Sequence, residues 1–122
     1  MSHFNQIDEA QRAQSLRPIG VSAVGPDALA EPSGLTFEAD EHDGSTAALL
    51  QTSNGHQYML LHHFESPDPG TEVLASERSI EPERDLDELL EVLDIGPDLV
   101  TWKLSREDAM ASQREIQLPD HT

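Results

Sequence analysis

Two apolar runs separated by a turn signal are the clearest pattern in the middle of the chain. The runs at residues 46–52 (TAALLQT) and 56–64 (HQYMLLHHF) flank the tripeptide at 53–55. An Asn-Gly pair is typical of a two-residue β-hairpin loop, because both residues readily adopt the left-handed conformation that this turn needs. The pattern therefore predicts a hairpin whose loop consists of Asn54 and Gly55.

The two-residue loop fixes the register of this hairpin and places apolar side chains on both of its faces. Gln51 then faces Tyr58, and Leu50 faces Met59. One face carries Leu49, Tyr58 and Leu60, and the other carries Leu50, Met59 and Leu61. A strand pair that is apolar on both faces lies centrally in a sheet. We expect a helix to cover one face, and either the N-terminal segment or a second subunit of a homodimer to cover the other.

The segment that begins at Pro82 has the clearest helical pattern. Four leucines recur at the i, i+3, i+4, i+7 spacing of an amphipathic helix, namely Leu86, Leu89, Leu90 and Leu93. Pro82 suits the first turn, and acidic residues crowd the N-terminal end, where the helix dipole favours them. Gly96 suits the C-terminal cap. The pattern predicts a helix between these two residues.

Weaker patterns predict the remaining elements. Alternation of apolar and polar residues predicts strands over 19–24, 35–40, 71–77 and 99–104. A thin apolar stripe predicts a helix over 5–16, and residues 25–34 read as a loop or tether. Ser105 and Asp108 resemble a capping box, which predicts a last helix of about three turns.

In chain order these elements predict an α+β fold. We expect a small antiparallel sheet of three to five strands, with the Asn-Gly hairpin at its centre, packed against one or two C-terminal helices. Residues 1–34 are expected to form an N-terminal segment of helix plus loop or tether, 35–118 the single domain, and 119–122 a disordered tail.

A competing interpretation makes residues 85–104 a helix-turn-helix with Gly96 in the turn. Its second helix carries Lys103 as a cation, with Arg106 just beyond it, among several acidic residues. A helix that reads the DNA major groove needs more positive charge than this. We therefore favour a helix followed by a strand.

The composition of the chain is strongly acidic. Its 122 residues include 24 Asp and Glu against seven Lys and Arg, which gives a formal charge of −17. Such a charge argues against direct binding to nucleic acid or to an anionic membrane.

The absence of cysteine excludes disulfides and thiolate chemistry. No signal-peptide pattern or membrane-spanning apolar run occurs, so we expect a cytoplasmic protein.

The acidic residues are concentrated on and around the predicted helix. Between residues 65 and 98, twelve acids and two arginines give a local charge of −10. A row of carboxylates lies opposite the leucines on the helix, formed by Glu83, Asp87, Glu91 and Asp94. We expect this row to dock a basic protein partner. Tyr58 and Trp102 are candidate anchors, because aromatic side chains are common at interface centres.

A chaperone for a secreted protein is one form of such a protein-binding module. Three other functions stay open alongside it. The single lysine, Lys103, beside six arginines fits a housekeeping protein whose acidity reflects a high-salt, halophilic cytoplasm. A carboxylate row with a spacing of about 6 Å resembles backbone phosphates, which fits a DNA-mimic inhibitor. A small enzyme or ligand binder would use His62 or His63 with a neighbouring carboxylate.

No motif for catalysis, metal binding or cofactor binding stands out. His62 and His63 are adjacent in a predicted strand, so they point to opposite faces and do not share one metal ion. The acidic turn at residues 38–44 (EADEHDG) lacks the ligand spacing of a calcium loop. No nucleophile motif or glycine-rich phosphate loop occurs. We therefore predict no catalytic residue, no metal site and no cofactor.

Overall fold

The computed structural model describes residues 4–8, 10, 15–40, 42, 44–65, 70–79 and 81–117, without the side chains of 112–117. The strands are β1 (Phe4–Ile7), β2 (Leu16–Ser22), β3 (Glu38–Asp40), β4 (Ser45–Thr52), β5 (Gln57–His63), β6 (Thr71–Ser76) and β7 (Val100–Lys103). The helices are α1 (Pro26–Ser33), α2 (Pro82–Leu93) and α3 (Arg106–Gln117), with a 3₁₀ turn η2 (Pro97–Leu99). None of the described helices is both long enough and apolar enough to span a membrane.

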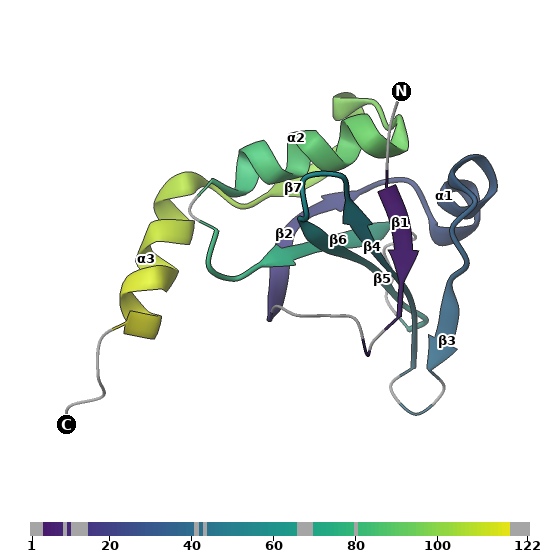
Figure 1. Cartoon of the computed structure of the whole chain (residues 1–122), viewed down its shortest axis with the longest axis horizontal. Coiled ribbons are helices and arrows are strands. Elements are labelled where there is room, and N and C mark those ends of the chain that lie inside the picture. Colours follow the sequence, from purple (N-terminus) through teal and green to yellow (C-terminus); the bar gives the residue numbers. More distant parts are fainter. Residues whose placement is uncertain are drawn as a thin grey trace.

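All seven strands belong to one open antiparallel sheet, so the fold is α+β as predicted (Figure 1). The strand order is β1-β4-β5-β6-β2-β7, and β3 also pairs with β4. The β1 and β3 strands share one edge of β4, because β1 lies opposite residues 49–52 and β3 lies opposite residues 45–47. The predicted count of three to five strands was too low, partly because β1 lies in a segment that was predicted as a helix.

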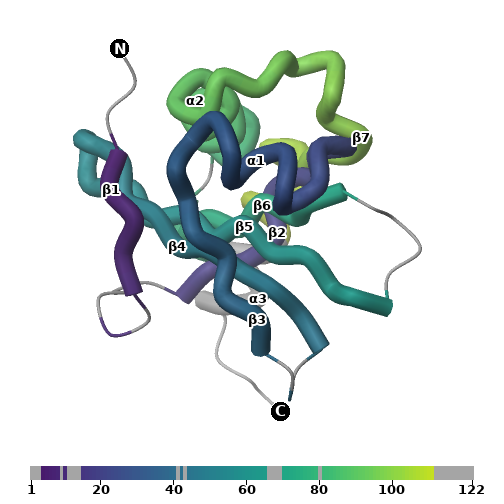
Figure 2. The backbone as a smooth tube through the Cα atoms, turned by 90° about the vertical axis from the view of Figure 1, so that its right-hand side faces the viewer, coloured from purple at the N-terminus to yellow at the C-terminus, as the bar shows by residue number. Residues whose placement is uncertain are grey.

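Helix α2 lies across one face of the sheet, and α1 lies on the same side (Figure 2). The four predicted leucines of α2 are all buried and form a core with strand residues that include Leu50, Tyr58, Leu60 and Val73. Leu29 joins this core from α1. The core is largely aliphatic, as the low aromatic content of the chain requires.

Gly20 of β2 lets α2 approach the sheet closely. A Cβ atom at this position would lie 2.9 Å from Cδ2 of Leu86 and 3.2 Å from the backbone oxygen of Trp102. Carbon atoms do not come this close without strain, so a larger residue at this position would displace the Leu86 side chain. Glycine at this position therefore leaves room for Leu86 between the helix and the sheet.

The β4–β5 hairpin exists, but its predicted register was wrong by one residue. Leu50 pairs with Tyr58, where Met59 had been predicted. Thr52 and His56 close the turn through the hydrogen bond from the Thr52 N–H to the His56 carbonyl oxygen, 2.9 Å. The loop thus has three residues, 53–55, and only its glycine is left-handed, with φ of 84°. A three-residue loop ending in a left-handed glycine is the common alternative to the two-residue turn.

When the pairing of two strands shifts by one residue, every side chain of one strand changes sides of the sheet relative to the side chains of its partner strand. Leu50, Tyr58 and Leu60 therefore share the face beneath α2, and Leu49, Met59 and Leu61 share the opposite face. On that opposite face, Leu49 is buried, whereas Met59 and Leu61 are half-buried. The second subunit predicted to cover this face stays a prediction.

The N-terminal segment differs most from its prediction. The helix expected over 5–16 was wrong, because residues 4–7 form β1 and β2 begins at Leu16, although residues 9 and 11–14 lie outside the described part. The strand predicted over 19–24 is present as β2, although it begins at Leu16 and ends at Ser22. It pairs with β6 and with β7, so it is no tether. Residues 26–33, expected as loop, form α1, which begins at a proline and ends at left-handed Gly34. The predicted strand over 35–40 shortens to the three residues of β3.

The C-terminal elements follow the predictions closely. Helix α2, strands β6 and β7 and helix α3 lie where the sequence placed them, so the helix-turn-helix interpretation was wrong. Ser105 caps α3, because its Oγ accepts the N–H of Asp108 at 3.1 Å. The cap of α2 was wrong: the left-handed residue is Asp94, with φ of 57°, not Gly96. The predicted tail at 119–122 lies outside the described residues.

Candidate functional sites at helix α2

The outward face of α2 carries the predicted row of carboxylates. Its four members, Glu83, Asp87, Glu91 and Asp94, are all exposed. Lys103 Nζ lies 3.7 Å from Glu83 Oε2, and both side chains are at least half exposed. An exposed pair of this kind is weak because water screens it. Glu83 therefore stays largely solvated, and the row, called the acidic row below, presents its negative charge to solvent.

A hollow of about 320 Å³ lies beside the acidic row, between α2 and β7. Its lining residues are Leu86, Asp87, Leu90, Pro97, Val100, Thr101, Trp102 and Lys103. Leu86 and Leu90 supply apolar surface from the helix, and Asp87 belongs to both the hollow and the acidic row. We call this hollow the α2–β7 groove. It brings apolar surface and negative charge together on one side of the molecule.

The two predicted aromatic anchors lie in different environments. Trp102 is 47% exposed and lines the α2–β7 groove, so it is accessible to a partner. Tyr58 is only 1% exposed and belongs to the core. A side chain this deeply buried does not touch a partner on the surface, so the prediction of Tyr58 as an anchor was wrong.

Tyr58 takes part instead in a hydrogen-bonded cluster around Glu88 of α2. The Tyr58 hydroxyl donates to Glu88 Oε1 at 2.7 Å and lies 3.0 Å from the backbone oxygen of Asp85. His56 Nδ1 lies 2.8 Å from the same carboxylate oxygen, and Asn54 Nδ2 donates to Oε2 at 2.6 Å. One carboxylate of the helix thus binds three residues of the β4–β5 hairpin.

The cluster shifts the pKa values of two of its members. Burial of Glu88 acts to raise its pKa, but the hydrogen bonds from His56, Tyr58 and Asn54 together outweigh burial and lower the pKa below its usual value of 4.5. Burial, followed by the hydrogen bond to Glu88 and its negative charge, raises the pKa of Tyr58 far above 10. Glu88 is therefore a carboxylate at neutral pH, and Tyr58 stays a neutral donor.

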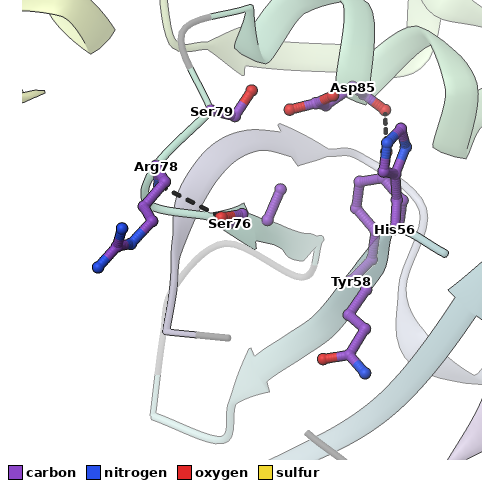
Figure 3. A pocket seen from close by; sticks show the side chains of 8 residues that line it. His56, Tyr58, Ser76, Arg78, Ser79 and Asp85 are labelled. Atoms are coloured by element: carbon purple, nitrogen blue, oxygen red, sulfur yellow. Dashed lines mark hydrogen bonds between the residues drawn. The ribbon is translucent and has the colours of Figure 1, made fainter. Parts of the chain in front are cut away.

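A second hollow opens beside this cluster, at the N-terminal end of α2 (Figure 3). One part, of about 320 Å³, is lined by His56, Gln57, Tyr58, Ala75, Ser76, Arg78, Ser79 and Asp85. A neighbouring part, of about 410 Å³, is lined by His56, Ser79, Glu81, Arg84 and Asp85. Because the two parts share three residues, they form one depression, which we call the N-terminal hollow.

The histidines singled out in the sequence lie away from both hollows. His62 Nδ1 lies 2.8 Å from the backbone oxygen of Gly70, and His63 Nε2 lies 3.9 Å from a carboxylate oxygen of Glu72. Within the described part of the chain, no three His, Asp or Glu side chains gather in a way that could hold a metal ion. His56 and Glu88, which the sequence reasoning did not bring together, lie closer to each other, at 2.8 Å.

Comparisons with known proteins add no relative to this picture. No family model matches the chain, and searches of curated proteins and of solved structures find no match either. The acidic row, the α2–β7 groove and the N-terminal hollow are therefore interpreted from the residues of this chain alone.

Proposed function

We propose that the protein is a binding module that docks a basic, amphipathic segment of another protein across the acidic row and the α2–β7 groove. The observation that carries this proposal is the shared position of Asp87. It stands in the row of exposed carboxylates and also lines a groove with leucine on its floor. A partner with cations beside apolar side chains fits such a surface.

The spacing of the acidic row suits a partner segment that is itself helical. Carboxylates one turn apart on α2 lie about 5–6 Å from one another. Lysines or arginines at i, i+4 on a partner helix repeat at the same distance. The apolar side chains beside them would enter the α2–β7 groove and pack on Leu86, Leu90 and Trp102.

The two parts of the surface contribute differently to binding. The acidic row, on a chain of charge −17, attracts a basic partner over a long range and speeds association, an effect that salt weakens. Burial of Trp102 and of the apolar groove slows dissociation, because tightly packed aromatic residues dominate binding energies. Binding is therefore expected to be faster at low salt, with a residence time that depends on Trp102.

The test uses a synthetic helical peptide with lysine at i, i+4 and leucine on the adjacent face. In one protein variant Glu83→Gln, Asp87→Asn and Glu91→Gln neutralise the row. A matched variant removes three charges elsewhere, on α1 and β3, by Asp27→Asn, Glu31→Gln and Glu38→Gln. We expect the first variant to weaken peptide binding by at least about tenfold and the second by less than about twofold. Equal weakening in both variants would show that only net charge matters and would contradict the proposal.

Trp102 supplies a direct readout of the groove, since it is the only tryptophan of the chain. Its fluorescence is expected to shift to shorter wavelength as the peptide binds, because burial removes water from the indole ring. Trp102→Ala should weaken binding mainly through faster dissociation. An unchanged emission spectrum in the saturated complex would place the peptide elsewhere.

A further inference from the structure

The two ends of the α2–β7 groove differ in charge. After the short turn η2, β7 runs back along α2, so the two walls of the groove have opposite directions (Figure 1). Lys103, the last residue of β7, accordingly lies beside Glu83 in the first turn of α2, with 3.7 Å between Nζ and Oε2. We call the end formed by residues 81–84 and 103–106 the balanced end, and the end formed by residues 87–98 the acidic end.

Three of the seven basic residues of the chain gather at the balanced end. Lys103 lies beside Glu83, and Arg84 pairs with Glu81 at 3.3 Å. Arg106, at the start of α3, lines a hollow of about 360 Å³ together with Glu81, Glu83 and Arg84. It is exposed and forms no ion pair with any residue that the structure describes. Each acid at this end therefore has a cation beside it, and one arginine is left over.

The acidic end is built from a stretch of sequence that contains no basic residue. No Lys or Arg occurs between residues 85 and 102. Three acids of the acidic row stand here on α2, and Asp98 follows Pro97 on the other wall of the groove; all four are exposed. The dipole of α2 increases the contrast, because it places partial positive charge at the balanced end and partial negative charge at the acidic end. The surface thus changes along α2 from balanced to strongly negative.

Two further acids lie beyond the balanced end and do not change this contrast. Glu107 and Asp108 stand in the first turn of α3, where the helix dipole favours them. Neither lines the hollow beside Arg106. A partner lysine over the balanced end has to compete with Lys103 for the carboxylate of Glu83. A partner carboxylate at the same place can accept hydrogen bonds from Lys103 and Arg106.

We infer that the groove binds its partner helix in one orientation, which the order of charges along the partner sets. This inference rests on the proposed function and adds to it the kind of segment that fits. The partner carries its lysines or arginines over the acidic end and a carboxylate over the balanced end. Its apolar side chains pack between the two ends on Leu86 and Leu90. A helix in which the two signs alternate fits worse, because it places like charges together at both ends.

The test compares two synthetic helical peptides that have the same composition, net charge and row of leucines. The segregated peptide has glutamates in its first half and lysines in its second half, whereas the two residues alternate in the alternating peptide. At an ionic strength of about 0.1 M, we expect the segregated peptide to bind with a Kd at least about fivefold lower. Equal affinities would overturn the inference, because net charge and apolar contact alone would then explain binding.

A nitroxide label on one end of the segregated peptide reports the orientation directly, because it broadens the amide resonances of nearby residues in the isotope-labelled protein. A label at the lysine end should broaden the resonances of Asp94 and Ile95. A label at the glutamate end should broaden those of Leu104 and Arg106. If both labels broaden the same set of resonances, the peptide binds in both orientations and the inference is wrong.

Two variants of the protein separate the balanced end from the net charge. Lys103→Gln combined with Arg106→Gln removes the cations that a partner carboxylate would meet, so the two peptides should then differ by less than about twofold. Arg78→Glu is the matched control, since it changes the net charge by the same amount at an exposed side chain outside the groove. This control should keep the difference between the peptides, and its loss there would also overturn the inference.

The outcomes distinguish this inference from the proposed function. If the lysine peptide of the first test binds but the segregated and alternating peptides have equal affinities, only the order of charges is wrong. If none of the three peptides binds, the proposed function itself is wrong, and the inference about orientation falls with it.

Discussion

Glu88 differs from the other acidic residues of α2 in that its side chain is only 20% exposed and its carboxylate binds three side chains of the β4–β5 hairpin. Hydrogen bonds to a charged group contribute more to stability than bonds between neutral groups. The cluster therefore stabilises the contact between the turn at residues 53–55 and α2. It also orients the imidazole of His56 beside the N-terminal hollow.

The lowered pKa of Glu88 makes this contribution dependent on pH. The ionised form is favoured in the folded protein, so its stabilisation is complete above the unfolded pKa of about 4.5 and is lost as the pH falls through the lower folded pKa. We expect Glu88→Gln to reduce the free energy of unfolding by about 1–3 kcal/mol at pH 7. The difference from the unmodified protein should shrink below pH 4.5, as measured by urea unfolding between pH 3 and pH 7.

The exposed acid Glu31 of α1 provides the control for this measurement. Glu31→Gln also removes one negative charge, but the side chain has no described contact. The free energy of unfolding of the Glu31→Gln variant is expected to follow that of the unmodified protein across the whole pH range. A Glu88→Gln difference that stays constant from pH 7 to pH 3 would contradict the role given to the ionised carboxylate.

Sequence reasoning found the exposed acids but not the role of half-buried Glu88. Glu83, Asp87, Glu91 and Asp94 follow directly from helical periodicity, because the residues opposite a leucine stripe face water. The bond between His56 and Glu88 joins residues 32 positions apart. No local pattern encodes that distance, and it depends on how the helix lies on the hairpin. His56 was placed at the start of the predicted strand that follows the Asn-Gly turn, and no pattern marked it for a polar contact.

At the scale of elements, the C-terminal cap of α2 is occupied by a residue whose backbone conformation and charge are both unfavourable there. Asp94 occupies the left-handed cap position with φ of 57°, where glycine is preferred. Its negative charge also lies at the helix C-terminus, where the dipole disfavours it. The helix tolerates a strained and badly placed residue, which fits a role for its carboxylate outside folding.

We expect Asp94→Gly to raise the free energy of unfolding by about 0.5–1 kcal/mol, since glycine adopts this conformation without strain. Asp94→Ala removes the same charge but keeps a Cβ atom in the left-handed region, so it should be less stable than the glycine variant. Thermal unfolding of the three proteins followed by circular dichroism measures both differences. A glycine variant no more stable than the alanine variant would disprove the strain at this cap.

The predictability of the elements depended on their length and on where their partners lie. Helix α2 was predicted because four leucines repeat over its 12 residues. Strand β1 was predicted as part of a helix, because its four residues have little alternation and its partner β4 lies much later in the chain. Strand β2 was predicted only from residue 19, three residues after its start at Leu16. The hairpin register was missed because only Gly55 needs the left-handed conformation, so Asn54 did not fix a two-residue loop.

At the scale of the whole molecule, the charge of −17 acts on the compact state through repulsion between carboxylates. Screening by salt shortens the range of this repulsion from about 10 Å at 0.1 M to about 3 Å at 1 M. We expect the protein to be folded at low salt, because its leucine-rich core is closed, with a Tm that rises by several degrees as NaCl is added. Thermal scans across this range measure the effect, with the variant carrying Asp27→Asn, Glu31→Gln and Glu38→Gln as the control for reduced charge.

This measurement also separates two explanations of the acidity. A chain that unfolds at low ionic strength and refolds only in molar salt would support adaptation to a high-salt environment. A chain that is folded at all salt concentrations, with peptide binding that weakens as salt is added, would support the docking surface on α2. The variant with reduced charge should show a smaller rise in Tm than the unmodified protein.

The position of β2 between β6 and β7 has a consequence for how the protein forms on the ribosome. Thr101 Oγ1 of β7 donates to the backbone oxygen of Val21 in β2, a residue 80 positions earlier in the chain. Contacts this distant in sequence slow folding, because a long loop must close before they form. While the chain is being made, one side of β2 stays an unpaired edge that neighbouring chains can bind. The open edge of β2 is covered only when residues 100–103 have emerged.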